Sequence, residues 1–254
     1  MTEVKGYTHG TPCWVDLGAS DVDAAGAFYR GLFGWETLDQ GEEAGHYTMC
    51  ALRGQSVAAI APSQGGHPSW TTYFAVDDVD VAMRRIAAAG GTVLDGPIDV
   101  FETGRMAVAQ DPTGGFFCLW QAREHIGATL VNEPGALCWN ELAVRDVPRA
   151  LSFYGAVFDM TAKTSELAGH LYHELQVDGR TVAGVMPMNE QWPPDAPTHW
   201  MTYFGVEDCD AAVAHAEGLG ATVSVPPTDI PPGRFSVLND PQGAVFSIIT
   251  ARGD

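Results

Sequence analysis

Two acidic residues stand in equivalent places of the chain, each two positions after a tryptophan. Asp16 follows Trp14, and Glu141 follows Trp139. Side chains two residues apart on a β-strand point to the same face, so each carboxylate shares a surface with a large aromatic ring. A carboxyl group placed in a cavity can act as a general acid or base, and it can pair with a cationic group of a ligand. Asp16 and Glu141 are therefore candidate catalytic residues.

Aromatic side chains are expected around both carboxylates. The same strand alternation predicts six inward-facing rings, which are Trp14, Tyr73, Phe116, Trp120, Trp139 and Tyr203. Large rings with a polar tip suit a flat, mostly apolar ligand, so we interpret these residues as the walls of a binding site. The alternative is that the rings fill a core.

The residues that carry this chemistry occur in two copies of one sequence pattern. Three pairs of segments correspond: 10–36 with 135–161, 70–74 with 200–204, and 111–114 with 240–243. Self-similarity over such a distance indicates a duplication. We predict one domain over residues 1–124, a linker over 125–134 and a second domain over 135–254.

Each copy divides again into two units of strand, helix and further strands. Residues 12–18 alternate as a strand does, and Asp21 begins an amphipathic helix that ends at Gly34. Strands are predicted over 47–52 and 56–61. The pattern then restarts at Trp70, so we expect two βαβββ units in each domain and an α+β fold class.

These motifs resemble those of the vicinal-oxygen-chelate superfamily, which includes glyoxalases, bleomycin-resistance proteins and extradiol dioxygenases. The resemblance is carried by Asp-Val before a helix with Phe-Tyr, by Val-Asp-Asp-Val-Asp, by Ala-Ala-Gly-Gly and by Asp-Pro-x-Gly-x-x-Phe. It implies glyoxalase-like domains in tandem, each with a curled, cup-shaped sheet that carries the chemistry on its concave face. Fold alone does not fix the function.

The resemblance also locates where metal-dependent members of the superfamily hold their ion. The corresponding positions here are Trp14, Thr71, Trp139 and Met201 on first strands, and Cys118 and Ser247 on last strands. Indole and thioether groups cannot replace imidazole or carboxylate toward a hard divalent ion, so we expect no metal and no other cofactor. The alternative is a displaced metal site formed by Glu141, His173 and His199.

Composition excludes several other classes of function. Acidic residues outnumber basic ones 32 to 13, and a net charge of −19 disfavours nucleic acid and anionic membranes as partners. No apolar run approaches the ~20 residues of a membrane span, and residues 1–10 lack the pattern of a secretory signal, so a cytoplasmic protein is expected. No nucleophile elbow or Gly-rich phosphate loop is visible in the sequence.

Three functions remain open. The first is a metal-independent protein that binds a small aromatic or apolar molecule, as a monomer or homodimer. The second is an enzyme of the same superfamily, either a lyase or isomerase that uses Asp16 or Glu141, or a hydroxylase or dioxygenase-like member with a displaced metal. The third is a structural or interaction module whose cups are packed shut.

Overall fold

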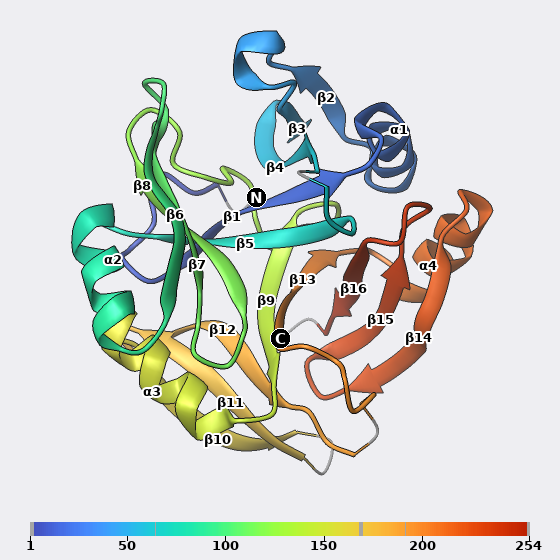
Figure 1. Ribbon diagram of the computed structural model, residues 1–254. Helices are drawn as coiled ribbons and strands as arrows, with labels where there is room; N and C mark the ends of the chain where they lie inside the picture. Colours follow the sequence, from blue (N-terminus) through green and yellow to red (C-terminus); the bar gives the residue numbers. More distant parts are fainter. Residues whose placement is uncertain (1–2, 64, 168–169, 191, 253–254) are drawn as a thin grey trace.

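Two β-sheets of eight strands each form the protein, with helices packed beside them (Figure 1). The computed structural model describes residues 3–63, 65–167, 170–190 and 192–252. The first half of the chain supplies one sheet and the second half the other. The tandem duplication and the α+β class predicted from the sequence are therefore confirmed.

The first half runs twice through the order of strand, helix and three strands. Its elements are β1 (Pro12–Ala19), α1 (Val22–Phe33), β2 (Glu36–Asp39), the short 3-10 helix η1 (Glu42–Ala44), β3 (Thr48–Leu52), β4 (Gln55–Pro62), β5 (Ser69–Ala75), α2 (Val79–Ala88), β6 (Thr92–Val100), β7 (Gly104–Gln110) and β8 (Phe116–Ala122). The strands lie in the order β2-β3-β4-β1-β5-β8-β7-β6. At the centre β1 and β5 are antiparallel, and Trp14 lies opposite Tyr73.

The second half repeats this arrangement. Its elements are β9 (Leu137–Val144), α3 (Val147–Phe158), β10 (Thr161–Leu167), β11 (His170–Val177), β12 (Arg180–Pro187), β13 (His199–Gly205), α4 (Cys209–Gly218), β14 (Thr222–Ile230), β15 (Gly233–Asn239) and β16 (Val245–Ala251). The strands lie in the order β10-β11-β12-β9-β13-β16-β15-β14. Trp139 lies opposite Tyr203, as Trp14 does opposite Tyr73.

Capping residues explain where the helices begin and end. The side chain of Asp21 accepts a hydrogen bond from the backbone N–H of Ala24 at the start of α1, and Gly34 ends the helix in the left-handed conformation. Asp78 caps α2 in the same way. The predicted helix start at Asp21 and its end at Gly34 are confirmed.

Strand β2 was not predicted from the sequence. It has four residues, three of them exposed, and it forms one edge of the first sheet. A short edge strand that buries neither face lacks the alternation of apolar and polar residues by which strands are recognised.

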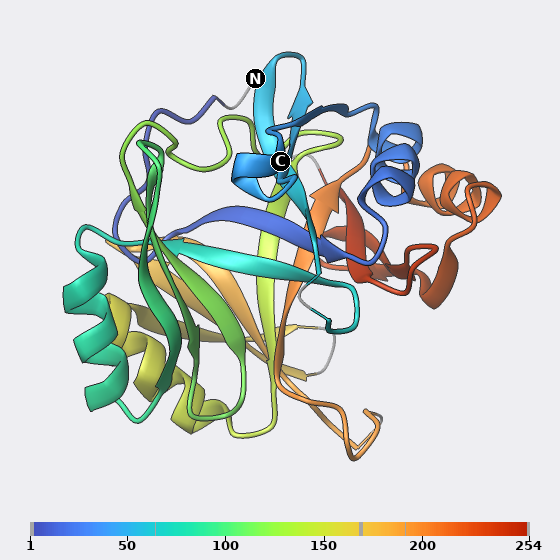
Figure 2. The same cartoon turned by 45° about the horizontal axis from the view of Figure 1, so that its top comes forward.

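The cores beside the helices join the two halves of the chain. In one core Tyr29 of α1 packs against Phe246 of β16, with ring centroids 5.6 Å apart. In the other, Phe74 of β5 stacks on Phe158 of α3 at 5.0 Å. Figures 1 and 2 show α1 beside α4 and α2 beside α3 in both views. Each half therefore completes the core of the other.

Two equivalent buried hydrogen bonds connect the halves. The Tyr29 hydroxyl donates to Asp240 at 3.1 Å, and the Tyr154 hydroxyl donates to Asp111 at 2.8 Å. Both tyrosines belong to the Phe-Tyr pairs of the helices, and both aspartates begin an Asp-Pro-x-Gly turn of the other half. These repeated motifs therefore stabilise the contact between the domains.

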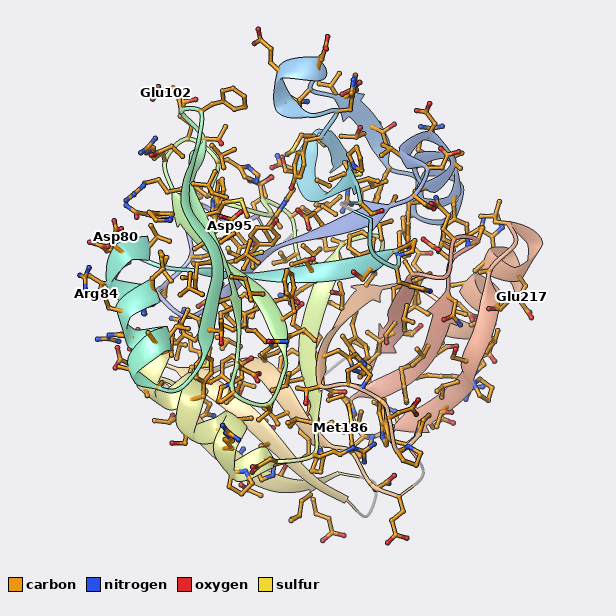
Figure 3. All side chains as sticks on the ribbon, in the orientation of Figure 1. Asp80, Arg84, Asp95, Glu102, Met186 and Glu217 are labelled. Atoms are coloured by element: carbon orange, nitrogen blue, oxygen red, sulfur yellow. The ribbon has the colours of Figure 1, made fainter. Side chains whose placement is uncertain are left out.

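The outer surfaces of α2 and α4 carry charged side chains. Asp80 and Arg84 on α2 and Glu217 on α4 lie at the periphery of the molecule (Figure 3). No helix among the described residues is both long and apolar enough to span a bilayer.

The segment predicted as a linker packs against the first sheet. The backbone N–H of Ala128 donates to the carbonyl of Cys13 at 2.8 Å, and that of Thr129 donates to Ser56 at 2.8 Å. Ala128 and Thr129 therefore lie against β1 and β4.

Candidate functional site

Strands β1 and β9 each place their tryptophan and carboxylate on the face of the sheet away from the helices, which we call the cup face. On β1 the alternate residues Val15 and Leu17 pack into the core beside the helices, whereas Trp14 belongs to a separate cluster. On β9 Leu142 packs into a helix-side core. The predicted strand register is therefore correct.

The cup face of the first sheet carries a hydrogen-bonded group of four side chains. The indole N–H of Trp14 donates to the hydroxyl oxygen of Tyr47 at 2.9 Å. Tyr47 in turn donates to Asp16 at 3.2 Å, and Tyr73 donates to the same Asp16 oxygen at 2.6 Å. Two phenols thus hold one carboxyl group.

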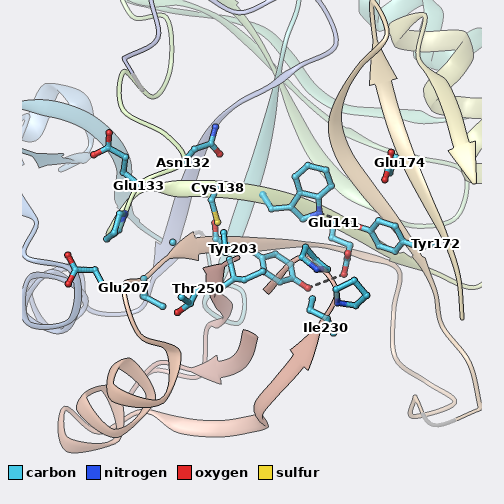
Figure 4. A pocket seen from close by; sticks show the side chains of 18 of the residues that line it. Asn132, Glu133, Cys138, Glu141, Tyr172, Glu174, Tyr203, Glu207, Ile230 and Thr250 are labelled. Carbon is cyan, nitrogen blue, oxygen red and sulfur yellow. Dashed lines mark hydrogen bonds between the residues drawn. The ribbon is translucent and has the colours of Figure 1, made fainter. Parts of the chain in front are cut away.

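The second sheet repeats the group with glutamate in place of aspartate. The indole N–H of Trp139 donates to the hydroxyl oxygen of Tyr172 at 3.0 Å, and Tyr203 donates to Glu141 at 3.0 Å (Figure 4). The Tyr172 hydroxyl also hydrogen-bonds Glu141. We call these two groups the Trp-Tyr-acid-Tyr clusters.

Burial shifts both carboxyl groups toward the protonated form. Desolvation raises the pKa of Asp16 to about 6, although hydrogen bonds from Tyr73 and Tyr47 oppose the shift. Desolvation also raises the pKa of Glu141, against the hydrogen bonds from Tyr172 and Tyr203. A carboxyl group in this state can give or take a proton near neutral pH.

The first cup is filled by the protein's own side chains. The imidazole of His125 packs edge-on against Trp14 with centroids 4.6 Å apart, and the indole of Trp120 donates to the His125 carbonyl at 2.7 Å. Trp14 is only 3% exposed. Phe116, which was expected to line this cup, is 43% exposed at the end of β8. Trp14 and Trp120 therefore act as core residues, whereas Phe116 does not line the cup.

The second cup contains a cavity of about 780 Å³. Its walls are mainly aromatic and apolar, and its lining includes Cys138, Trp139, Glu141, Tyr172, Glu174, Tyr203, Ile230, Pro231, Pro232 and Ile249. This volume falls in the range of ~300–1,000 Å³ that is common for drug-sized ligands. Of the predicted site residues, the structure brings Trp139, Glu141 and Tyr203 together around this cavity.

The strand positions where the resemblance implies metal ligands carry poor ligands in this chain. Trp139, Tyr203 and Ser247 stand level on three neighbouring strands, as Trp14, Tyr73 and Cys118 do in the first sheet. Thr71 is level with Asp16, and Met201 is level with Glu141. Burial raises the pKa of the Cys118 thiol well above its usual value, which disfavours the thiolate that binds metals. These donor sets do not fit a hard divalent ion.

The three residues of the displaced metal site are not brought together. His173 alternates with Tyr172 and Glu174, so its side chain lies on the helix side of β11, where it is hydrogen-bonded to Thr164 at 2.9 Å. His199 lies at the start of β13 and is hydrogen-bonded to the carbonyl of Pro197 at 2.8 Å. Among the described residues, no three His, Cys, Asp or Glu side chains are grouped to hold a metal.

Tyr47 and Tyr172 are site residues that sequence reasoning missed. Tyr172 follows Tyr47 by 125 positions, as Trp139 follows Trp14. Extending the gapless alignment of the first strands by this offset would therefore have paired the two tyrosines.

The chain belongs to the Glyoxalase/Bleomycin resistance protein/Dioxygenase superfamily, whose family model matches residues 13–119 and 130–248. It is 46% identical over 258 residues to "Putative glyoxylase CFP32" of Mycobacterium tuberculosis (strain CDC 1551 / Oshkosh), with 98% of each chain covered. It is 37% identical over 263 residues to "Anthracycline biosynthesis protein DnrV" of Streptomyces peucetius, with 97% of this chain and 95% of the relative covered.

Solved structures share the fold at low sequence identity. The Mn(II)-bound glyoxalase from Novosphingobium aromaticivorans matches with a TM-score of 0.65 and 18% identity over 95% of this chain and 82% of that one. The 2,3-dioxygenase LapB from Pseudomonas sp. KL28 matches with a TM-score of 0.66 and 15% identity over 100% of this chain and 94% of that one. The architecture of the superfamily is therefore present over the whole chain.

Proposed function

We propose that the second cup binds a small, largely aromatic or apolar molecule, and that it does so without a metal ion. The observation that carries this proposal is the cavity of about 780 Å³ walled by Trp139, Tyr172 and Tyr203. Flat rings on the walls favour a flat ligand, because ring-on-ring contact buries apolar area at little cost in side-chain entropy. Glu141 at the cavity offers one polar anchor.

The names of two relatives support a small-molecule ligand. One is named as a glyoxylase, and the other is named for anthracycline biosynthesis. Both names refer to the chemistry of small molecules. We assign the first domain a structural role, since its equivalent cup is filled by Trp14, Trp120 and His125.

Titration with a planar probe tests this proposal. Acridine added to the purified protein should quench tryptophan fluorescence and saturate at one molecule per chain. Metal analysis of the same sample, prepared without chelator, should find well under one divalent ion per chain. Unsaturable quenching by acridine and by a wider panel of aromatic compounds would show that both cups are closed. A stoichiometric divalent ion at the second cup would contradict metal-independent binding.

A second candidate function is acid–base catalysis by Glu141. The observation in its favour is that burial raises the pKa of this carboxyl group beside an open cavity. A protonated Glu141 could protonate a bound carbonyl or enolate, and the ionised form could remove a proton next to a carbonyl, as lyases and isomerases require.

Hydrogen exchange on a bound ketone separates this candidate from simple binding. Aromatic ketones incubated with the protein in D2O should exchange their α-hydrogens faster than without protein, as measured by proton NMR. Glu141→Gln should abolish the acceleration while acridine still binds. Equal exchange by the wild type and by Glu141→Gln would leave binding as the function.

A further inference from the structure

The second cup carries acidic side chains on opposite sides of one aromatic cavity. Figure 4 shows Glu174 on one side, Glu133 and Glu207 on the other, and Glu141 between them. We propose that this cup selects planar aromatic ligands that carry a cationic amine, and that Glu174 is the residue that pairs with the amine. The inference rests on the proposed function, because it requires the cup to take up a ligand.

Basic residues are missing from the cavity lining. In the described part of the chain the lining contains no Lys, Arg or His. An anionic ligand would therefore lose its hydration without gaining a positively charged partner in the cavity. Burial of an unpaired charge costs free energy. A cationic ligand would meet carboxylates in the same place.

The four glutamates are not equally free to pair with a ligand. Glu133 already forms a close ion pair with Arg53. Glu207 is exposed, where water and salt screen its charge. Glu141 accepts hydrogen bonds from two phenols, and its burial disfavours the ionised form.

The carboxylate of Glu174 is partly buried, and its ion pair with a cationic side chain is long. Its side chain is 28% exposed, and its nearest cation, Lys163, lies 3.7 Å away with a side chain that is 64% exposed. Thr181 donates a hydrogen bond at 3.2 Å. Both contacts use the Oε2 atom, so among the described residues Oε1 is left for a ligand.

Aromatic rings next to Glu174 add to the attraction for a cation. Tyr172 lies two residues before Glu174 on the same face of β11. Its hydroxyl oxygen accepts a hydrogen bond from the indole N–H of Trp139. A cation over the face of a tyrosine or tryptophan ring is stabilised by the negative charge density of that face. An amine at Glu174 would therefore lie beside rings that also contact the flat body of the ligand.

Comparison of the two domains shows that the fold does not require the charge of Glu174. In the second sheet Glu174 pairs with Gly184, which pairs with Glu141. In the first sheet the same row contains Met49, Ala59 and Asp16. The central carboxylate is kept in both cups, whereas the second one is present only in the open cup. The strand pairing itself does not require a glutamate at this position.

Three probes of similar shape and different charge test the proposal. At pH 8, 9-aminoacridine is a cation, acridine is neutral and anthracene-9-carboxylate is an anion. We expect the wild type to bind them in that order of decreasing affinity, as measured by fluorescence titration. Glu174→Gln should weaken binding of 9-aminoacridine by about 3- to 10-fold, as removal of one partly solvated ion pair does, and leave acridine unchanged.

The matched control is Glu217→Gln on the outer face of α4 (Figure 3). It removes the same charge from a protein of net charge −19, so it reports the long-range field alone. Equal affinity of the wild type for acridine and 9-aminoacridine, or equal losses in both variants, would overturn the cation preference and leave the binding function intact. If none of the three probes binds, the proposed function itself fails.

Discussion

Replacing Trp14 and Trp139 by alanine, one at a time, should separate a structural cup from a ligand-binding cup. The two residues are equivalent in the repeat, and each donates its indole N–H to a tyrosine hydroxyl, at 2.9 and 3.0 Å. Their surroundings differ, because Trp14 is covered by His125 whereas Trp139 lines the cavity. The same substitution should therefore change stability in one cup and affinity in the other.

Trp14→Ala should mainly lower the free energy of unfolding. Trp14 is buried, and its removal leaves a cavity among His125, Tyr73 and Trp120 and a lost hydrogen bond to Tyr47. Truncation of a buried tryptophan costs about 3–5 kcal/mol, a large part of the 5–15 kcal/mol that stabilises a typical domain. Affinity for acridine should stay within about twofold of the wild type, because the second cup is not altered.

Trp139→Ala should mainly weaken ligand binding. The residue forms a wall of the cavity and is partly exposed there, so its loss costs less stability. Loss of the contact between the indole and an aromatic ligand should remove about 1–3 kcal/mol of binding free energy, which corresponds to a roughly 5- to 150-fold higher Kd.

Urea denaturation followed by circular dichroism gives the stability of each variant, and calorimetric titration with acridine gives the affinity. Calorimetry is preferred because each variant loses one of the tryptophans that fluorescence reports. Full affinity in Trp139→Ala would refute the second cup as the binding site. A folded Trp14→Ala that loses affinity as strongly as Trp139→Ala would show that the first cup also takes up ligand.

Three further changes test other parts of the structure. Burial raises the pKa of Asp16 to about 6, so folding should lose up to about 3 kcal/mol as pH rises from 4 to 6, and Asp16→Asn should flatten this slope in urea titrations. Tyr154→Phe removes the donor to buried Asp111 and should lower the unfolding free energy by about 1–3 kcal/mol within a single transition; two separate transitions would contradict the shared cores. In Gly184→Ala the added methyl group would overlap the Tyr172 hydroxyl, so acridine affinity should fall, and an unchanged Kd would place Tyr172 outside the site.

The repeat and its capping residues made most of the fold predictable. Asp21 and Asp78 mark helix starts, and the alternation around Trp14 gives the correct face of β1. These signals are local, because a cap or an alternating strand depends on residues a few positions apart. Each unit could therefore be placed before its partners were known.

The contacts between units were not predictable in the same way. Nothing in the sequence says that Tyr29 bonds Asp240 rather than the equivalent Asp111, because both turns carry the same motif. The position of residues 125–130 depends on the shape of the face that they cover. That shape exists only after the first sheet has formed. For this reason the alternation of residues along the strands could not predict which of the two cups is open.

The duplicated Trp-Tyr-acid-Tyr cluster has different surroundings in the two cups. In the first cup His125 packs against Trp14, while Tyr47 and Tyr73 donate hydrogen bonds to Asp16 on the same face of the sheet. In the second cup the equivalent hydrogen bond holds Tyr203 against Glu141, and both residues line the cavity. Because the halves share their cores, the closed cup supports the framework on which the open cup depends. A change that loosens the first cup should therefore reach the second through the common core, as lost stability of the whole chain and not as an altered choice of ligand.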